Sequence, residues 1–143
     1  MSPRNTCFIH TGRLLEIRVR GGYRSVGDVD EMIAMMAAEF ARAPEPTRIV
    51  IAADWRQCRL LTPDVALRAT QMLEKSNPRV ERSAILHHPG QATSVLQVLR
   101  LSREAKLPYR RVFTVSAEMR DWLGEVLQPP ELARLDLLIR ADD

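Results

Sequence analysis

The sequence predicts one α/β domain, a single mixed sheet made of an N-terminal hairpin and parallel strands, covered by about four helices. Three observations lead to this class. Strand patterns alternate with helix patterns along most of the chain, which requires crossover connections between parallel strands. The first two strand patterns are instead joined by a short turn, as in an antiparallel hairpin. The length of 143 residues suits one domain with one core.

The predicted hairpin pairs residues 6–10 with residues 13–20 through a Thr-Gly turn. From Leu15 to Arg20 apolar and charged residues alternate, a pattern typical of a half-buried strand. The two glycines that follow end this strand. We therefore expect an edge hairpin with one face on the core.

The rest of the chain alternates between helices and strands. Apolar residues recur every three or four positions in the predicted helices, over residues 25–42, 62–76, 90–105 and 116–127. Strands are predicted between them, over residues 47–54, 80–86 and 110–114. The apolar run 49–53 is uninterrupted, which places its strand in the middle of the sheet.

Polar residues mark the predicted helix starts. Ser25, Thr62 and Ser116 stand where N-caps belong, and Pro63 follows Thr62 at a first helical position. A Pro-Pro pair ends the fourth helix. We take residues 1–143 as one domain with a core of about 13–127, followed by a tail or short helix over 128–143.

Composition excludes several classes of function. The net charge is only +3, the basic residues are scattered and aromatic residues are 5% of the chain, so we do not expect nucleic-acid binding. No apolar run reaches 18 residues and the N-terminus lacks the apolar stretch of a signal peptide, so we expect no transmembrane segment and a cytoplasmic protein. The two cysteines lie in no metal-binding spacing, and no motif implies a cofactor.

Candidate site residues follow three of the predicted parallel strands. Asp54 and Trp55, His87 and His88, and Thr114 each come at the carboxyl end of a strand. Open α/β sheets bind ligands outside these ends, where the strand order reverses. Adjacent histidines on an extended chain point to opposite sides, so one metal ion is not expected there.

The loop after residue 54 can be interpreted in two ways. We expect Asp54 to accept hydrogen bonds from loop backbone, as aspartate commonly does at turns. Trp55, Arg56 and Arg59 then form a surface for a partner or ligand, because Trp and Arg are enriched at binding hot spots. Trp55 covering the core is the equally favoured alternative. Cys58 is incidental in both.

The third helix pattern has two apolar faces. One consists of Ala92, Val95, Leu96 and Leu99, and the other of Val98, Leu101 and Ala105. A helix with two such faces needs a second packing partner, from the same subunit or from another chain. A homodimer is one candidate, since twofold dimers are the commonest assemblies.

Several segments resemble the STAS/SpoIIAA-like family, in particular a bacterial branch grouped with lipid-binding domains. The matching segments are "LLEIRVRG", "RIVIAAD", "LLTPDVAL", "VERSAIL" and "RRVFTVSAEMRDWL", within about residues 13–127. The resemblance implies this family's fold and an apolar or lipid-like ligand. Phosphorylated members carry Asp-Ser-Ser-Gly where this chain reads Thr62-Pro63-Asp64, and Thr62 fits a helix cap better than a phosphorylation site.

Two classes of function remain. The first is a non-catalytic regulatory or interaction domain that binds a protein partner or a small apolar ligand. The second is a small enzyme with a strand-end pocket around Asp54, His87 and His88. No nucleophile motif, phosphate-binding loop or paired carboxylate supports catalysis, so the sequence favours the first class.

Overall fold

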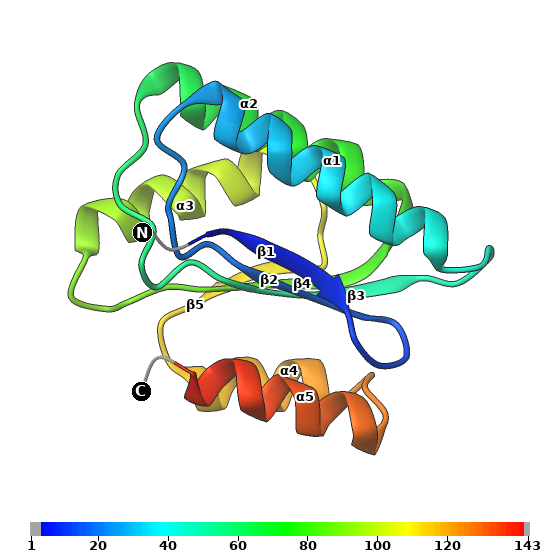
Figure 1. The fold of residues 1–143 in the computed structure, drawn as a ribbon. Helices are drawn as coiled ribbons and strands as arrows, with labels where there is room; N and C mark the ends of the chain where they lie inside the picture. The colour runs from blue at the N-terminus through cyan, green and yellow to red at the C-terminus, as the bar shows by residue number, and fades with distance from the viewer. Residues whose placement is uncertain (1–3, 142–143) are drawn as a thin grey trace.

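The computed structural model describes residues 4–141 and contains the predicted α/β architecture (Figure 1). One mixed sheet has the order β1-β2-β3-β4-β5. Its strands are β1 Thr6–Ile9, β2 Leu14–Arg18, β3 Ile49–Asp54, β4 Val80–Leu86 and β5 Arg110–Phe113. β1 pairs with β2 in antiparallel fashion, and the other neighbours are parallel. The prediction that residues 49–53 lie in the middle of the sheet is confirmed.

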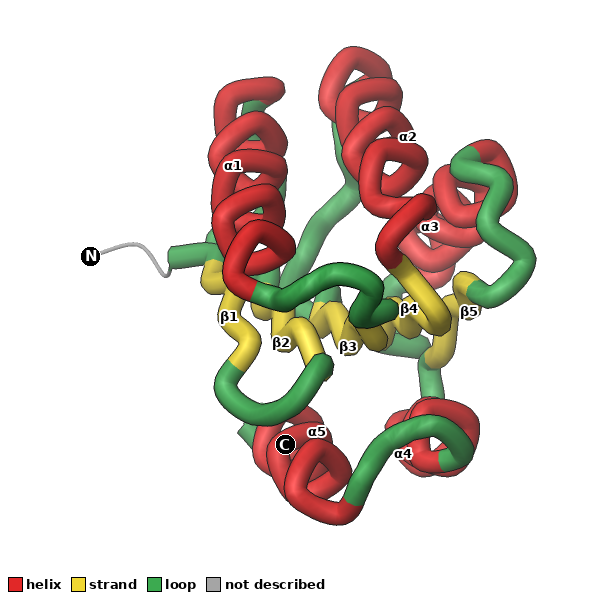
Figure 2. Tube along the Cα trace, turned by 90° about the vertical axis from the view of Figure 1, so that its right-hand side faces the viewer, coloured by secondary structure: helices red, strands yellow, loops and turns green. Residues whose placement is uncertain are grey.

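Helices cover both faces of the sheet (Figure 2). The first layer consists of α1 Val26–Arg42, α2 Pro63–Ser76 and α3 Ala92–Glu104, with a 3-10 turn at Asn77–Arg79 after α2. The second layer consists of α4 Ser116–Gly124 and α5 Pro129–Arg140. β1 and β5 form the two edges of the sheet.

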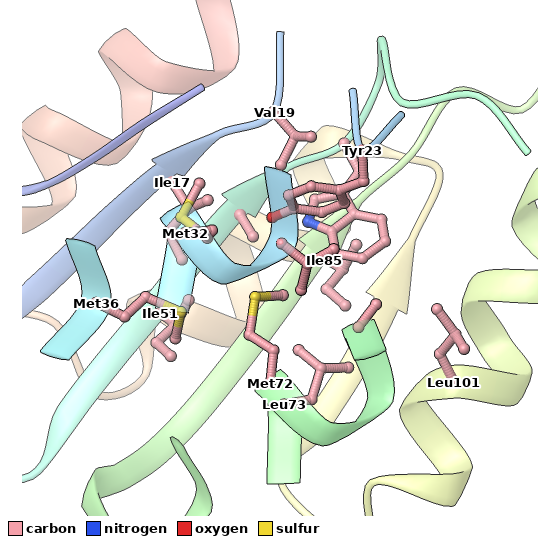
Figure 3. Close-up of a cluster of buried hydrophobic side chains, with 14 of the residues drawn as sticks. Ile17, Val19, Tyr23, Met32, Met36, Ile51, Met72, Leu73, Ile85 and Leu101 are labelled. Atoms are coloured by element: carbon pink, nitrogen blue, oxygen red, sulfur yellow. The ribbon is translucent and has the colours of Figure 1, made fainter. Parts of the chain in front are cut away.

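The larger part of the core lies between the sheet and α1–α3 (Figure 3). Ile17, Ile51 and Ile85 project from three neighbouring strands toward Met32 and Met72 of the helices. Each large side chain buried in this way contributes roughly 1.5–3 kcal/mol of hydrophobic stabilisation. Met32 and Met36 of α1 therefore serve packing.

A second cluster fills the opposite face of the sheet. Strand residues such as Val50 and Leu86 contact buried side chains of α4 and α5, namely Met119, Trp122, Leu123, Leu135, Leu138 and Ile139. The segment after residue 127, for which the sequence left open a tail or a short helix, is thus a helix of 12 residues within this cluster. The core extends beyond the predicted limit of residue 127.

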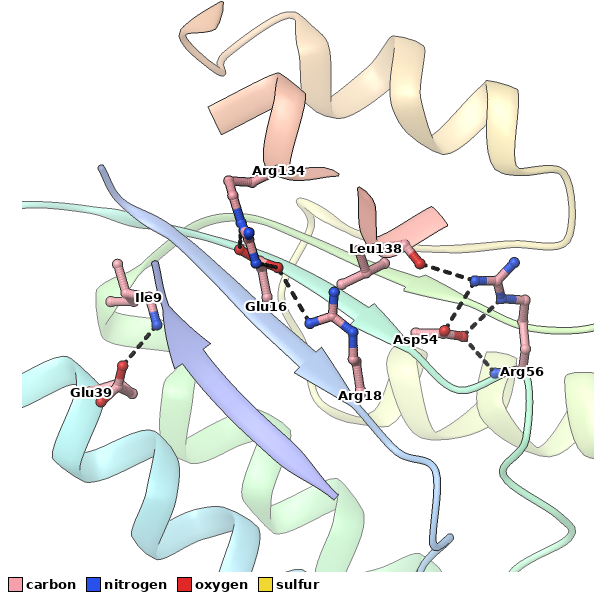
Figure 4. Close-up of polar contacts among 8 residues, drawn as sticks. All are labelled: Ile9, Glu16, Arg18, Glu39, Asp54, Arg56, Arg134 and Leu138. Atoms are coloured by element: carbon pink, nitrogen blue, oxygen red, sulfur yellow. Dashed lines mark hydrogen bonds and ion pairs between the residues drawn. The ribbon is translucent and has the colours of Figure 1, made fainter. Parts of the chain in front are cut away.

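The half-buried character predicted for the second strand is wrong. Leu14 to Ile17 are all buried, because α5 covers the face that carries Glu16. Glu16 is 1% exposed and accepts hydrogen bonds from Arg134 of α5 at 2.9 and 3.0 Å (Figure 4). Arg18 lies 3.3 Å from the same carboxylate. A charged residue in an alternating pattern here marks a buried ion pair, not a solvent-exposed face.

Two of the three predicted N-cap residues stand at the N-cap position, and the third is shifted by one residue. The Ser25 hydroxyl accepts the Asp28 N–H at 3.3 Å, as an N-cap does. Thr62 occupies the N-cap position of α2, but its hydroxyl donates to the Asp64 carboxylate at 2.6 Å instead of capping backbone. Ser116 is the first residue of α4, so Val115 is its N-cap.

Candidate functional site

The carboxyl ends of β3, β4 and β5 meet at one side of the sheet, as predicted. The Trp55 N–H donates to the Leu86 carbonyl at 2.8 Å, and the His87 N–H donates to the Phe113 carbonyl at 2.8 Å. Side chains of successive residues nevertheless point to opposite faces of a sheet. Asp54 therefore lies on the α4–α5 face, whereas Trp55 and His87 lie on the α1–α3 face. The strand ends do not bring these residues into one constellation.

The strand order also contains no reversal at this end of the sheet. Chain order and strand order are identical, and α1, α2 and α3 all cover the same face. Open α/β sheets commonly bind ligands where the strand order reverses, and this sheet contains no such reversal. The reversal of strand order on which the expected strand-end site was based is therefore absent.

Asp54 and Arg56 tie the β3 end to the C-terminal helix (Figure 4). The Asp54 carboxylate accepts hydrogen bonds from the Arg56 backbone N–H and Nε, both at 3.0 Å, so the predicted bond to loop backbone is confirmed. The Arg56 guanidinium also donates to the carbonyls of Leu138 and Ile139 at 3.2 and 2.9 Å. A cation is favourable at the carbonyl end of a helix. Arg56 therefore docks α5 and is not held out to a partner.

Trp55 and Cys58 belong to the core. Trp55 is 1% exposed and packs edge-to-face on Tyr23, with ring centroids 5.4 Å apart, so it covers the core and does not offer a surface to a partner. Burial raises the pKa of the Cys58 thiol to about 11. A thiol with that pKa is almost entirely protonated at neutral pH and is a poor nucleophile.

The two histidines occupy different environments. His87 is 1% exposed; its Nδ1 accepts the His88 N–H at 2.7 Å, and its buried Nε2 has no hydrogen-bond partner in the described chain. Burial lowers the pKa of His87 below its usual value. His88 is exposed, and its Nδ1 accepts the Gly90 N–H at 2.9 Å. Within residues 4–141, no three His, Cys, Asp or Glu side chains gather as metal ligands would.

Besides His88, three more predicted site residues are accessible. Thr114 is half-buried beyond the end of β5, and Arg59 and Thr62 are exposed at a surface hollow of about 600 Å³. Arg20 and Arg24 line the same hollow, which is therefore basic. It is separate from Asp54 and His87, so it does not complete a strand-end active site.

A larger groove of about 690 Å³ runs between α3 and the edge strand β5. Its apolar lining consists of Leu99, Leu107, Pro108, Val112 and Phe113. Leu96, on the outer face of α3, is 68% exposed, and Leu99 is 39% exposed. Of the two predicted apolar faces of α3, the one with Val98, Leu101 and Ala105 is buried against the core. The other, with Leu96 and Leu99, is left uncovered within residues 4–141.

Cations surround this groove. Arg103, Lys106 and Arg111 are exposed, and no ion pair engages them within the described chain. Buried Arg110 donates to the Leu73 carbonyl at 3.2 Å, at the C-terminal end of α2. The lining contains no acidic residue. The site residues expected from the sequence omit this groove, although the two-faced pattern of α3 indicated it.

Comparisons of the chain with protein-family models, curated proteins and solved structures found no match. The STAS/SpoIIAA-like resemblance therefore stays a prediction. Within residues 4–141, no helix combines the length and the apolar character that a membrane span requires.

Proposed function

We propose that this chain is a non-catalytic interaction domain of the STAS/SpoIIAA-like type, which acts in the cytoplasm and binds a protein partner through the groove between α3 and β5. One observation carries the proposal: apolar side chains of α3 and β5 line an uncovered groove with a basic rim. Interfaces are commonly formed by such apolar patches with a polar rim.

The internal contacts of the strand-end residues support the same proposal. Asp54 and Arg56 are engaged with each other and with α5, and Trp55, Cys58 and His87 are buried. An active site needs a nucleophile or base within reach of a substrate. These side chains instead hold the two helical layers on the sheet.

A photo-crosslinking experiment in cells tests the proposed function. A photoreactive amino acid replaces Leu99 in the groove or, as the matched control, Leu67, which is 62% exposed on α2. We expect a discrete crosslinked protein from position 99 that disappears when Leu96→Asp is added. Equal products from both positions, or a product that survives Leu96→Asp, would overturn the proposal.

The enzyme alternative depends on His87, whose buried, unpartnered Nε2 is the group of that region that packing alone does not explain. His87→Gln and Asp54→Asn would both abolish turnover of a substrate if a strand-end active site existed. If both variants keep the crosslink at position 99, partner binding does not depend on the strand-end residues, and the binding and enzyme hypotheses can be tested separately.

A further inference from the structure

We propose that the partner of the α3–β5 groove is an extended segment of alternating apolar and acidic residues, which pairs with β5 as a sixth strand. This inference rests on the proposed function and adds the mode of binding and the chemistry of the partner. It requires an open strand edge, an apolar strip beside that edge and unpaired cations, and all three occur together here.

The open edge follows from the parallel pairing of β5 with β4. The carbonyls of Tyr109 and Phe113 accept hydrogen bonds from β4, so the odd-numbered residues of this stretch direct their backbone toward β4. The carbonyl of Arg110, both backbone groups of Val112 and the N–H of Thr114 consequently face outward. No hydrogen bond within residues 4–141 uses these groups, which leaves a template for another strand.

The opposite edge of the sheet is protected. On β1, the Ile9 N–H donates to the Glu39 carboxylate of α1 at 2.7 Å (Figure 4). A charged side chain on an edge is a common way to block further strand pairing. Ile9 of β1 is therefore engaged where Val112 of β5 is open, which favours β5 as the edge for a partner.

The two sides of β5 differ in chemistry, and this difference determines why apolar and acidic residues should alternate in the partner strand. Val112 packs toward the α1–α3 core, on the side where Leu99 and Leu107 line the groove. Arg111 points to the other side, where its guanidinium lies 4.8 Å from the centre of the Trp122 ring. An added strand would direct alternate side chains to these two sides. Apolar side chains of that strand would contact the side of Val112, and carboxylates would meet the side of Arg111.

Charge argues against a second copy of this chain as the occupant. A twofold interface brings a surface against its own copy, so the cations of Arg103, Lys106 and Arg111 would face the same cations. An acidic partner meets the opposite charge. A lipid could satisfy the apolar strip and the cations but could not pair with the outward backbone groups of Val112, which is why we favour a peptide.

Lys106 adds a second indication that a cation is placed at this rim. It has a φ of 62° directly after the end of α3, a conformation that suits glycine and is unfavourable for lysine. Its N–H donates to the Arg103 carbonyl at 3.2 Å, as in a helix C-terminal turn. We expect Lys106→Gly to raise the Tm while it weakens binding of an acidic strand.

Fluorescence anisotropy with a capped eight-residue peptide tests the proposal. The labelled peptide alternates Val or Ile with Asp or Glu. We expect it to bind the full chain, with affinity reduced about tenfold or more by Arg111→Glu or by Val112→Pro. Proline at Val112 removes an outward N–H and leaves the pairing with β4 intact. On binding, the amides of Val112 and Thr114 should become protected from hydrogen exchange, whereas the Ile9 amide should not change.

Matched controls separate strand pairing from general attraction. Arg20→Glu removes an exposed cation at another place and should leave peptide affinity within about twofold. A peptide methylated on alternate backbone nitrogens keeps its charge and should not bind the unaltered protein, a result that does not depend on whether the proline variant folds. Equal binding of the methylated peptide, or equal loss with Arg20→Glu, would overturn strand addition.

Two further measurements distinguish other occupants of the groove. Binding to phosphatidylglycerol vesicles but not to the peptide would assign the groove to lipid, and a dimer dissociated by Leu96→Asp would assign it to a second copy. Either result overturns this inference. If crosslinking at position 99 is specific while strand addition fails, the proposed function stands and only the mode of binding is wrong.

Discussion

His87 is neutral in the folded chain, and this has a consequence for stability. Its Nδ1 accepts a backbone N–H, which requires an unprotonated nitrogen, and burial lowers its pKa below the usual 6.5. The unfolded chain takes up a proton at this residue near pH 6.5, whereas the folded chain does so only at a lower pH. The free energy of unfolding should therefore decrease as the pH is lowered through that range. This residue contributes up to about 1.4 kcal/mol per pH unit to the decrease.

Urea unfolding of the wild type and of His87→Gln between pH 7.5 and pH 5.5 measures this contribution. The variant should lose less stability on acidification than the wild type does. Equal slopes for wild type and His87→Gln would show that His87 takes up its proton in the folded state.

Trp122 should dominate the packing of α4. It is 7% exposed and lies against Phe113, and the guanidinium groups of Arg82 and Arg111 lie 5.0 and 4.8 Å from its ring. Trp122→Ala should lower the free energy of unfolding by about 3–5 kcal/mol. Trp122→Phe should cost less, because it retains part of the buried area. An unchanged melting curve for the alanine variant would contradict this packing role.

The two tryptophans show what a sequence pattern can and cannot predict about single residues. Trp122 falls on an apolar stripe with Met119 and Leu123, so its burial was predictable. Trp55 follows a strand, where no period constrains it. Its burial depends on Tyr23, which comes from a loop after two glycines and packs edge-to-face on it. Contacts between loops distant in sequence carry no local signal.

At the scale of elements, α5 is anchored by a buried carboxylate. Glu131 is 3% exposed, and its two oxygens accept the N–H groups of Arg13 and Gln128, both at 2.7 Å. Gly12 has a φ of +60°, and a Cβ there would overlap the Glu131 carboxylate. The turn of the hairpin and the start of α5 are thus fitted to each other, which explains why glycine stands at this position.

Gly12→Ala should lower the free energy of unfolding by about 2–4 kcal/mol, since it combines an unfavourable φ with a steric overlap. Gly22→Ala is the matched control. Gly22 has a φ of +74°, but a methyl group added there would meet no atom within 4 Å, so it should show the backbone cost alone, about 1–2 kcal/mol. Chemical denaturation of both variants makes the comparison. Equal losses would mean that Glu131 moves aside freely.

At the scale of the whole molecule, part of the architecture could be predicted from the sequence and part could not. The strands, their parallel pairing and helices α1 to α4 followed from periodicity and from the alternation of helix and strand patterns. The contribution of α5 to the core did not, because its docking depends on Glu16–Arg134, Arg56 and Glu131, polar contacts between residues up to 118 positions apart. The strand-end site was expected at a reversal of strand order, and the sheet has none, because α1, α2 and α3 all cover the same face.

The last prediction concerns the ion pair that joins the two ends of the chain across the sheet. Glu16 is buried beneath α5 and holds Arg134 and Arg18 (Figure 4). Glu16→Gln leaves a buried amide that cannot neutralise these cations, and we expect it to cost about 1–3 kcal/mol. Replacing both partners of a buried pair with apolar residues often restores stability. Glu16→Leu with Arg134→Leu should therefore lose less than the sum of the two single leucine variants, as measured by urea unfolding. Additive losses would show that Glu16 and Arg134 stabilise the fold independently of each other.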